Sequence, residues 1–80
     1  MTLGESIRAH RLSVGMTISW LAGQLRVHRN TVTNWERGKT EPPAGQVVQI
    51  AWLTGCTVQD LLEGKNTEPV ITSQRFSPGV

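Results

Sequence analysis

The chain has 80 residues, of which 38% are hydrophobic, and its eight Lys and Arg side chains outnumber six carboxylates, for a formal net charge of +2. This length allows at most one domain, and the single cysteine, Cys56, excludes an internal disulfide and a cysteine-rich zinc site. The apolar residues are too interspersed for a secretion signal or a membrane-spanning segment. We therefore expect a soluble cytoplasmic protein in which Cys56 is a small buried side chain.

The charges are distributed unevenly along the chain. Four cations lie between residues 26 and 39 against the single carboxylate Glu36, whereas three carboxylates lie between residues 60 and 68 against Lys65. One end of the domain therefore suits a polyanion and the other does not.

A first helix is predicted over residues 3–13. Thr2 and Glu5 have the spacing of a capping box, and Gly15 supplies a stop. The apolar side chains that roughly follow helical spacing, and are expected to face the core, are Leu3, Ile7 and Leu12.

Two short helices are predicted next. Thr17 can cap the first of them, which should end near Gln24 and whose apolar side chains are Leu21, Ala22 and Leu25. The second covers residues 30–37, where only Val32 and Trp35 are apolar. Such a narrow apolar stripe cannot keep a helix folded alone, so this helix must dock on its neighbours and leave its other faces to water or a ligand.

The pattern continues with an exposed loop over residues 39–43 and two more helices. Pro43 can begin a helix that ends at Gly55 and buries Val47, Ile50, Ala51 and Thr54, and Thr57 can cap a brief last helix that carries Val58, Leu61 and Leu62. Helical periodicity is lost beyond Glu63. Residues 64–80 are therefore predicted to be a flexible tail, or else an arm in which the β-forming residues 70–76 pair with a second subunit.

The centre of the chain carries a recognisable motif. Its most telling residues are Val32, Trp35, Glu36, Arg37, Gly38 and Lys39. They are similar to the "I-x-x-W-E-x-G-K" end of the recognition helix in the Cro and phage-repressor family, also called XRE-type regulators, and the resemblance extends over about residues 3–63. It implies an all-α fold, a compact five-helix lambda-repressor-like DNA-binding domain over residues 1–63, followed by the tail.

A helix that enters the major groove must present short hydrogen-bonding side chains to the base edges along its first turns. The candidates here are Arg29, Asn30, Thr33 and Asn34. Asn can pair with adenine, Arg can pair with guanine, and a Thr methyl group can contact thymine. Any one of these residues alone would also fit an ordinary solvated helix face.

Phosphate contacts should flank these bases. The candidates are Thr17, His28, Arg37, Lys39 and Thr40, of which Arg37 and Lys39 are the strongest, and Arg26 can add to the charge. His28 occupies the family's usual Ser or Thr N-cap position, so capping is an equal alternative for it.

Other positions have structural interpretations. The resemblance implies a partly buried ion pair between Arg11 and Glu36 that joins the first helix to the third, with phosphate binding by Arg11 as the alternative.

The sequence departs from its relatives at Ile18, where a phosphate-binding Gln is common, and at Trp20, where an acidic capping residue is common. Arg26 replaces the common turn glycine, which implies either a less strained turn or an arginine held at positive φ. Thr54 replaces a core leucine, for which Leu53 can compensate.

The family resemblance also implies a homodimer on a palindromic operator, with an interface near the fifth helix formed by Trp52, Val58 and Leu62. Trp20 and Trp52 fit either contacts with a partner or partial burial at the edge of the core. Trp35 is expected to be in the core.

These observations predict a sequence-specific regulator of transcription that binds double-stranded DNA, and the short chain indicates a Cro-like or compact phage-type repressor. A protein-binding module such as an antitoxin is the alternative. Neither histidine has metal-ligand spacing, and no nucleophile motif or phosphate loop occurs, so we expect no enzymatic activity, metal or cofactor.

Overall fold

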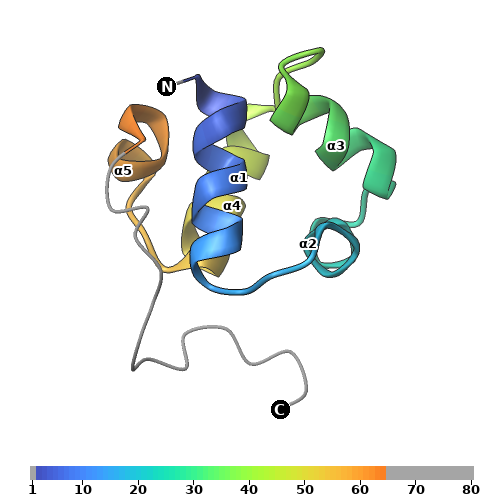
Figure 1. The fold of residues 1–80 in the computed structure, drawn as a ribbon, viewed down its shortest axis with the longest axis horizontal. Coiled ribbons are helices and arrows are strands. Elements are labelled where there is room, and N and C mark those ends of the chain that lie inside the picture. The colour runs from blue at the N-terminus through green and yellow to red at the C-terminus, as the bar shows by residue number, and fades with distance from the viewer. Residues whose placement is uncertain (1, 65–80) are drawn as a thin grey trace.

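Five helices account for most of residues 2–64, the part of the chain that the computed structural model describes. They are α1 (Leu3–Ser13), α2 (Ile18–Leu25), α3 (Arg29–Arg37), α4 (Ala44–Thr54) and α5 (Val58–Glu63). In Figure 1, α1 lies in the middle of the molecule in front of α4, with α5 on one side and α2 and α3 on the other. The predicted all-α, five-helix architecture is confirmed, and the predicted tail beyond residue 64 lies outside the described residues.

Side-chain caps determine where the helices begin. Thr2 and Glu5 form the predicted capping box, in which Thr2 Oγ1 accepts from Glu5 N at 3.1 Å and Glu5 Oε1 accepts from Thr2 N at 2.8 Å. The hydrogen bond from the Thr2 backbone, and then that from the Thr2 side chain, lower the pKa of the Glu5 carboxyl. Thr57 forms a similar capping box with Asp60 at the start of α5, whereas Thr17 caps α2 only through its hydroxyl oxygen, which accepts from Trp20 N at 3.0 Å. The caps thus give the helices nearly the boundaries that the sequence predicts.

The core consists of apolar side chains from all five helices and from the loop before α2. Its fully or almost fully buried members are Ile7, Met16, Leu21, Ala22, Leu25, Val32, Trp35, Val47, Ile50, Ala51 and Leu61. The prediction that Leu12 faces the core is wrong, because its side chain is 50% exposed. Five residues separate it from Ile7, which turns it about 140° away around the helix.

Polar side chains take the place on α1 that Leu12 was expected to fill. Ser6 and His10 are both buried, and the Ser6 hydroxyl donates a hydrogen bond to the carbonyl oxygen of Leu61 in α5. His10 Nδ1 lies 2.9 Å from the carbonyl oxygen of Ser6, which can only accept, so this nitrogen carries a proton. These hydrogen bonds satisfy buried polar groups and attach α5 to α1.

The three tryptophans lie in three different environments. Trp35 is 4% exposed and lies in the core, as predicted. Trp20 is partly buried and packs against the edge of this core. Trp52 is 80% exposed.

Two other positions at the end of α4 differ from simple apolar packing. Cys56 is half-buried rather than buried. Thr54 is buried, and its hydroxyl donates to the carbonyl oxygen of Ile50 at 2.8 Å. An intrahelical hydrogen bond therefore satisfies the hydroxyl that replaces the family's leucine.

Gly4 lies where α1 meets the end of α3. A Cβ atom at this position would overlap the carbonyl oxygen of Trp35 and lie 2.9 Å from that of Glu36. Only a glycine therefore allows the two helices to approach this closely. Nothing in the sequence pattern singles out this residue, because its role depends on a contact with a helix some thirty residues away.

We expect Gly4→Ala to destabilise the protein by about 1–3 kcal/mol, because backbone atoms rather than flexible side chains must move to make room for the methyl group. Gly45→Ala is the matched control, since Gly45 is also the second residue of its helix and a Cβ there would meet nothing within 4 Å. That control should be neutral or slightly stabilising. Urea unfolding measures both variants, and equal stabilities for the two would disprove the assigned role of Gly4.

Candidate nucleic-acid interface

Three contacts attach α3 to the rest of the domain. Val32 and Trp35 bury its apolar side, Gly4 of α1 lies against its last carbonyl groups, and Glu36 pairs with Arg11 of α1. Only two apolar side chains of this nine-residue helix are buried, so it depends on its neighbours for stability, as its sequence indicates.

The ion pair between Arg11 and Glu36 is bidentate and nearly buried. Arg11 Nε donates to Glu36 Oε2 at 2.7 Å and Nη2 donates to Oε1 at 3.0 Å, with the two side chains 8% and 5% exposed. Arg11 Nη1 donates to the carbonyl oxygen of Met16 at 2.9 Å. All three guanidinium nitrogens are thus engaged within the protein. This geometry, with the Arg11 side chain only 8% exposed, supports the structural role implied by the family resemblance over phosphate binding.

Arg11 also helps to position α2. Its carbonyl oxygen accepts a hydrogen bond from Met16 N at 3.0 Å, so the backbone and the side chain of Arg11 both hold the residue before the N-cap Thr17. One residue of α1 therefore connects the start of α2 and the end of α3.

The turn between α2 and α3 is tight and well capped. Arg26 ends α2 in the left-handed conformation at φ 58° and ψ 43°, so of the two alternatives for this position the structure contains the arginine at positive φ. His28 Nδ1 accepts a hydrogen bond from Asn30 N at 3.1 Å. The histidine thus caps α3, which begins at Arg29, one residue earlier than predicted.

The polar residues of α3 share one face. At 100° per residue, Arg29, Asn30, Thr33, Asn34 and Arg37 fall within an arc of about 140°, on the side opposite to Val32 and Trp35. Arg29, Asn30 and Arg37 are exposed, and Thr33 and Asn34 are half-buried. The side chains of Arg29, Asn30 and Asn34 form no hydrogen bond or ion pair within residues 2–64, whereas Thr33 Oγ1 donates to the carbonyl oxygen of Arg29 at 3.1 Å.

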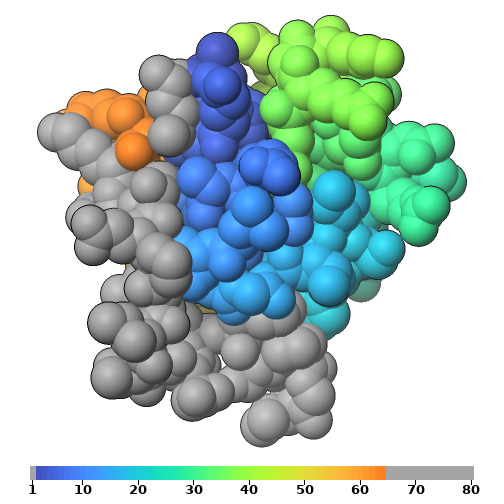
Figure 2. All heavy atoms as spheres, viewed as in Figure 1, coloured from blue at the N-terminus to red at the C-terminus, as the bar shows by residue number. Residues whose placement is uncertain are grey.

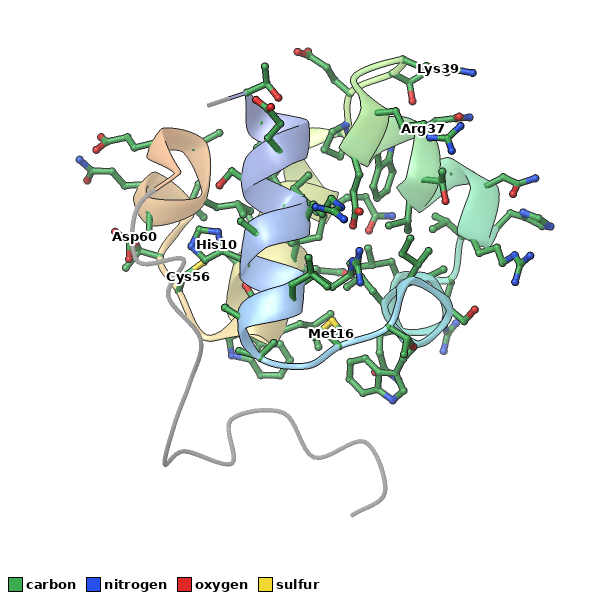
Figure 3. All side chains as sticks on the ribbon, viewed as in Figure 1. His10, Met16, Arg37, Lys39, Cys56 and Asp60 are labelled. Atoms are coloured by element: carbon green, nitrogen blue, oxygen red, sulfur yellow. The ribbon has the colours of Figure 1, made fainter. Side chains whose placement is uncertain are left out.

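The other predicted phosphate-binding residues lie at the starts of α2 and α3 and in the loop after α3. Thr17 and His28 are exposed N-caps of α2 and α3, and Lys39 and Thr40 follow the end of α3 in an exposed loop. The carbonyl oxygen of Asn34 accepts from Lys39 N at 2.9 Å, which holds this loop against the helix. Figure 3 shows Arg37 and Lys39 projecting outward from the end of α3, and Figure 2 shows that α3 and the following loop form one edge of the molecule.

This edge is cationic. Arg26, Arg29, Arg37 and Lys39 are all exposed, Glu36 is paired with Arg11, and one exposed carboxylate, Glu41, follows in the loop. The turn before α3, the outward face of α3 and the loop after it thus carry more positive than negative charge, which suits a polyanion.

Within residues 2–64, no three His, Cys, Asp or Glu side chains are placed to hold a metal ion together. None of the helices described has both the length and the apolar character needed to cross a bilayer.

Comparison with known proteins identifies the type of domain. A family model described as "Helix-turn-helix domain" matches residues 2–63. The chain is 30% identical to the HTH-type transcriptional regulator DicA of Escherichia coli (strain K12), over 98% of this chain and 61% of that protein. It is 34% identical to the HTH-type transcriptional regulator DdrOP3 of Deinococcus deserti, over 80% of this chain and 50% of that protein. It therefore spans between half and about three-fifths of these relatives' lengths, and no solved structure matches it significantly.

We expect Arg11→Ala to lower the free energy of unfolding by about 3–5 kcal/mol, because Glu36 would be left as a buried charge without a partner. Arg8→Ala, which removes an exposed arginine from the same helix, should change stability by less than about 0.5 kcal/mol. Replacing both partners, with Arg11→Met and Glu36→Leu, should recover much of the loss. Urea unfolding of the four proteins tests this, and an Arg11→Ala protein as stable as Arg8→Ala would contradict it.

Proposed function

The chain belongs to the helix-turn-helix family of the Cro and phage-repressor type, and from this premise we propose that it regulates transcription by binding double-stranded DNA in a sequence-specific manner. In this proposal α3 is the recognition helix and enters the major groove. Both curated relatives are named as transcriptional regulators. A protein with this function acts where bacterial DNA is, in the cytoplasm.

The polar face of α3 is the observation that carries the proposal. Arg29, Asn30 and Asn34 have no intramolecular side-chain partner within residues 2–64, and the first two are exposed. Their donors and acceptors are therefore available to base edges without breaking any contact of the fold. The Thr33 methyl group can meet a thymine methyl group while its hydroxyl stays bonded to the helix backbone.

The residues around this face are assigned to the phosphate backbone. Arg37 and Lys39 provide charge at the end of α3, Thr40 provides a hydroxyl in the adjoining loop, and Thr17 lies at the start of α2. His28 can combine both roles left open for it, because capping through Nδ1 leaves Nε2 as a donor on an exposed ring. Such contacts set the position of α3 on the duplex but do not select a sequence.

We assign a homodimer to the DNA-bound state, because one short helix reads only a few base pairs and a two-fold pair of them reads a palindrome. Trp52 is 80% exposed and Leu62 is 53% exposed, whereas Val58 is packed against the core. Val48, at 54% exposure, lies one helical turn from Trp52 on α4. The exposed apolar side chains of α4 and α5 favour this region as the interface.

Repression is the proposed direction of regulation. A protein bound at a promoter excludes other proteins from that duplex by its volume, whereas activation requires a further contact with the transcription machinery.

A protein-binding module, such as an antitoxin, is a second candidate. The exposure of Trp52 and Val48 favours it, because the same apolar surface can dock a different protein. The two candidates differ in their affinity for duplex DNA, which the first requires and which should fall steeply as salt increases.

Selection of bound duplexes from a random pool should enrich a palindromic motif. The double variant Asn30→Ala with Asn34→Ala should lose discrimination at particular positions, by about 1–3 kcal/mol for each bidentate contact removed. Gln49→Ala, which changes an exposed amide side chain of α4, is the matched control and should enrich the same motif as the unmodified protein. An unchanged motif in the double variant would refute the base-reading assignment, and no enrichment with the unmodified protein would favour the protein-binding candidate.

Sedimentation tests the proposed dimer. The unmodified protein should sediment as a dimer on the selected operator, and Trp52→Glu should weaken this association because it places a charge in an apolar interface. Leu12→Glu is the control, since it introduces the same charge at an exposed apolar position of α1. If the unmodified protein sediments as a monomer on saturating operator DNA, the proposed two-fold dimer is wrong.

A further inference from the structure

The turn before α3 contains an unusual backbone conformation. Five of the described residues have positive φ, and four of them are glycines: Gly15, Gly38, Gly55 and Gly64. The fifth is Arg26, at φ 58°. Left-handed backbone is costly for residues with a Cβ atom and almost free for glycine. At every other such position within residues 2–64, this chain uses the unstrained residue.

The surrounding structure imposes this conformation on Arg26. Its backbone N–H donates to the carbonyl oxygens of Ala22 and Gly23, and Val27 N donates to that of Ala22 at 3.0 Å. Leu25 before it is buried, and Val27 after it packs against the core. These contacts fix the left-handed backbone at position 26 whether or not the residue there favours that conformation.

Nothing within residues 2–64 compensates for this strain through the side chain. Arg26 is exposed, and its guanidinium forms no hydrogen bond or ion pair with the described residues. The carboxylate of Glu36 is already held by Arg11 through both oxygens. Arg26 also precedes Arg29 by three residues, so it adds to a local concentration of positive charge.

We propose that Arg26 is a DNA-backbone contact, and that the chain keeps an arginine at a glycine-like position because its guanidinium binds a phosphate of the operator. The inference rests on the proposed function. Arg26 lies at the turn that leads into the N-terminal end of α3, the end whose residues approach the base edges, and the duplex strands border a groove only about 12 Å wide. A guanidinium matches the geometry of a phosphate, and such a contact acts on every sequence equally.

The test compares stability and binding in the same variants of the full chain. Arg26→Gly should raise the midpoint of thermal unfolding by about 4–8 °C, because it relieves the strained backbone. It should weaken operator binding about five- to tenfold at ~0.1 M salt, and reduce the slope of log K against log salt by about 0.9 for each subunit. Binding to an unrelated duplex should weaken by the same factor. A change that raises stability while lowering affinity is not expected from a merely structural residue.

Three further variants separate the effect of the charge at position 26 from the effects of backbone strain and of net charge. Arg26→Asn removes the charge but suits the left-handed region, so it should lose the same affinity as Arg26→Gly. Arg26→Lys should keep the salt slope. Arg8→Gln removes one exposed charge from α1 and should keep most of the slope, because the proposed contact is local rather than an effect of net charge.

The outcomes distinguish this inference from the proposed function. If the unmodified protein binds an operator and Arg26→Gly binds it equally well with the same salt slope, Arg26 is not a backbone contact. A loss of slope in Arg8→Gln as large as that in Arg26→Gly also overturns the inference, because net charge would then explain both. If the unmodified protein binds no duplex, the proposed function and this inference fail together.

Discussion

The position of α3 depends on the buried, bidentate ion pair between Arg11 and Glu36 together with the burial of Val32 and Trp35. With two buried apolar side chains, α3 has little ability to hold itself against the domain, and its outward face contributes no apolar burial. The ion pair fixes the end of the helix, and the same arginine holds the backbone at Met16 through two hydrogen bonds. Besides packing directly against each other, the two helices of the motif are thus linked by a third helix that precedes both.

This arrangement separates the residues that fold α3 from those assigned to DNA. Val32, Trp35 and Glu36 face the domain, whereas Arg29, Asn30 and Asn34 have no side-chain partner in its described part. Substitutions on the outward face therefore remove few contacts of the fold. A domain of this construction can acquire a different sequence preference at little cost in stability.

Local signals in the sequence predicted the helices well. Thr2, Thr17 and Thr57 cap helices as expected, Gly38 and Gly55 end them, and the pairing of Arg11 with Glu36 followed from the family resemblance. The features that were missed depend on contacts between distant segments. Gly4 is an ordinary glycine until α3 is packed against it, and the burial of Ser6 and His10 in place of Leu12 depends on where α5 docks. The motif likewise identified the residues of the polar face, but not that Arg26 would keep the turn conformation of a glycine.

The hydrogen bond from Ser6 to Leu61 also bears on how the protein is made. It joins positions 55 residues apart, and Leu61 is a fully buried member of the core. During synthesis α1 leaves the ribosome well before α5, so the buried polar groups of α1 must stay in water until nearly the whole domain has emerged. Because this long-range contact closes the core, the nascent chain is expected to fold late and in one cooperative step rather than helix by helix. α3 itself docks on α1 and α2, which precede it in the chain, so what waits for the last helix is the closure of the core.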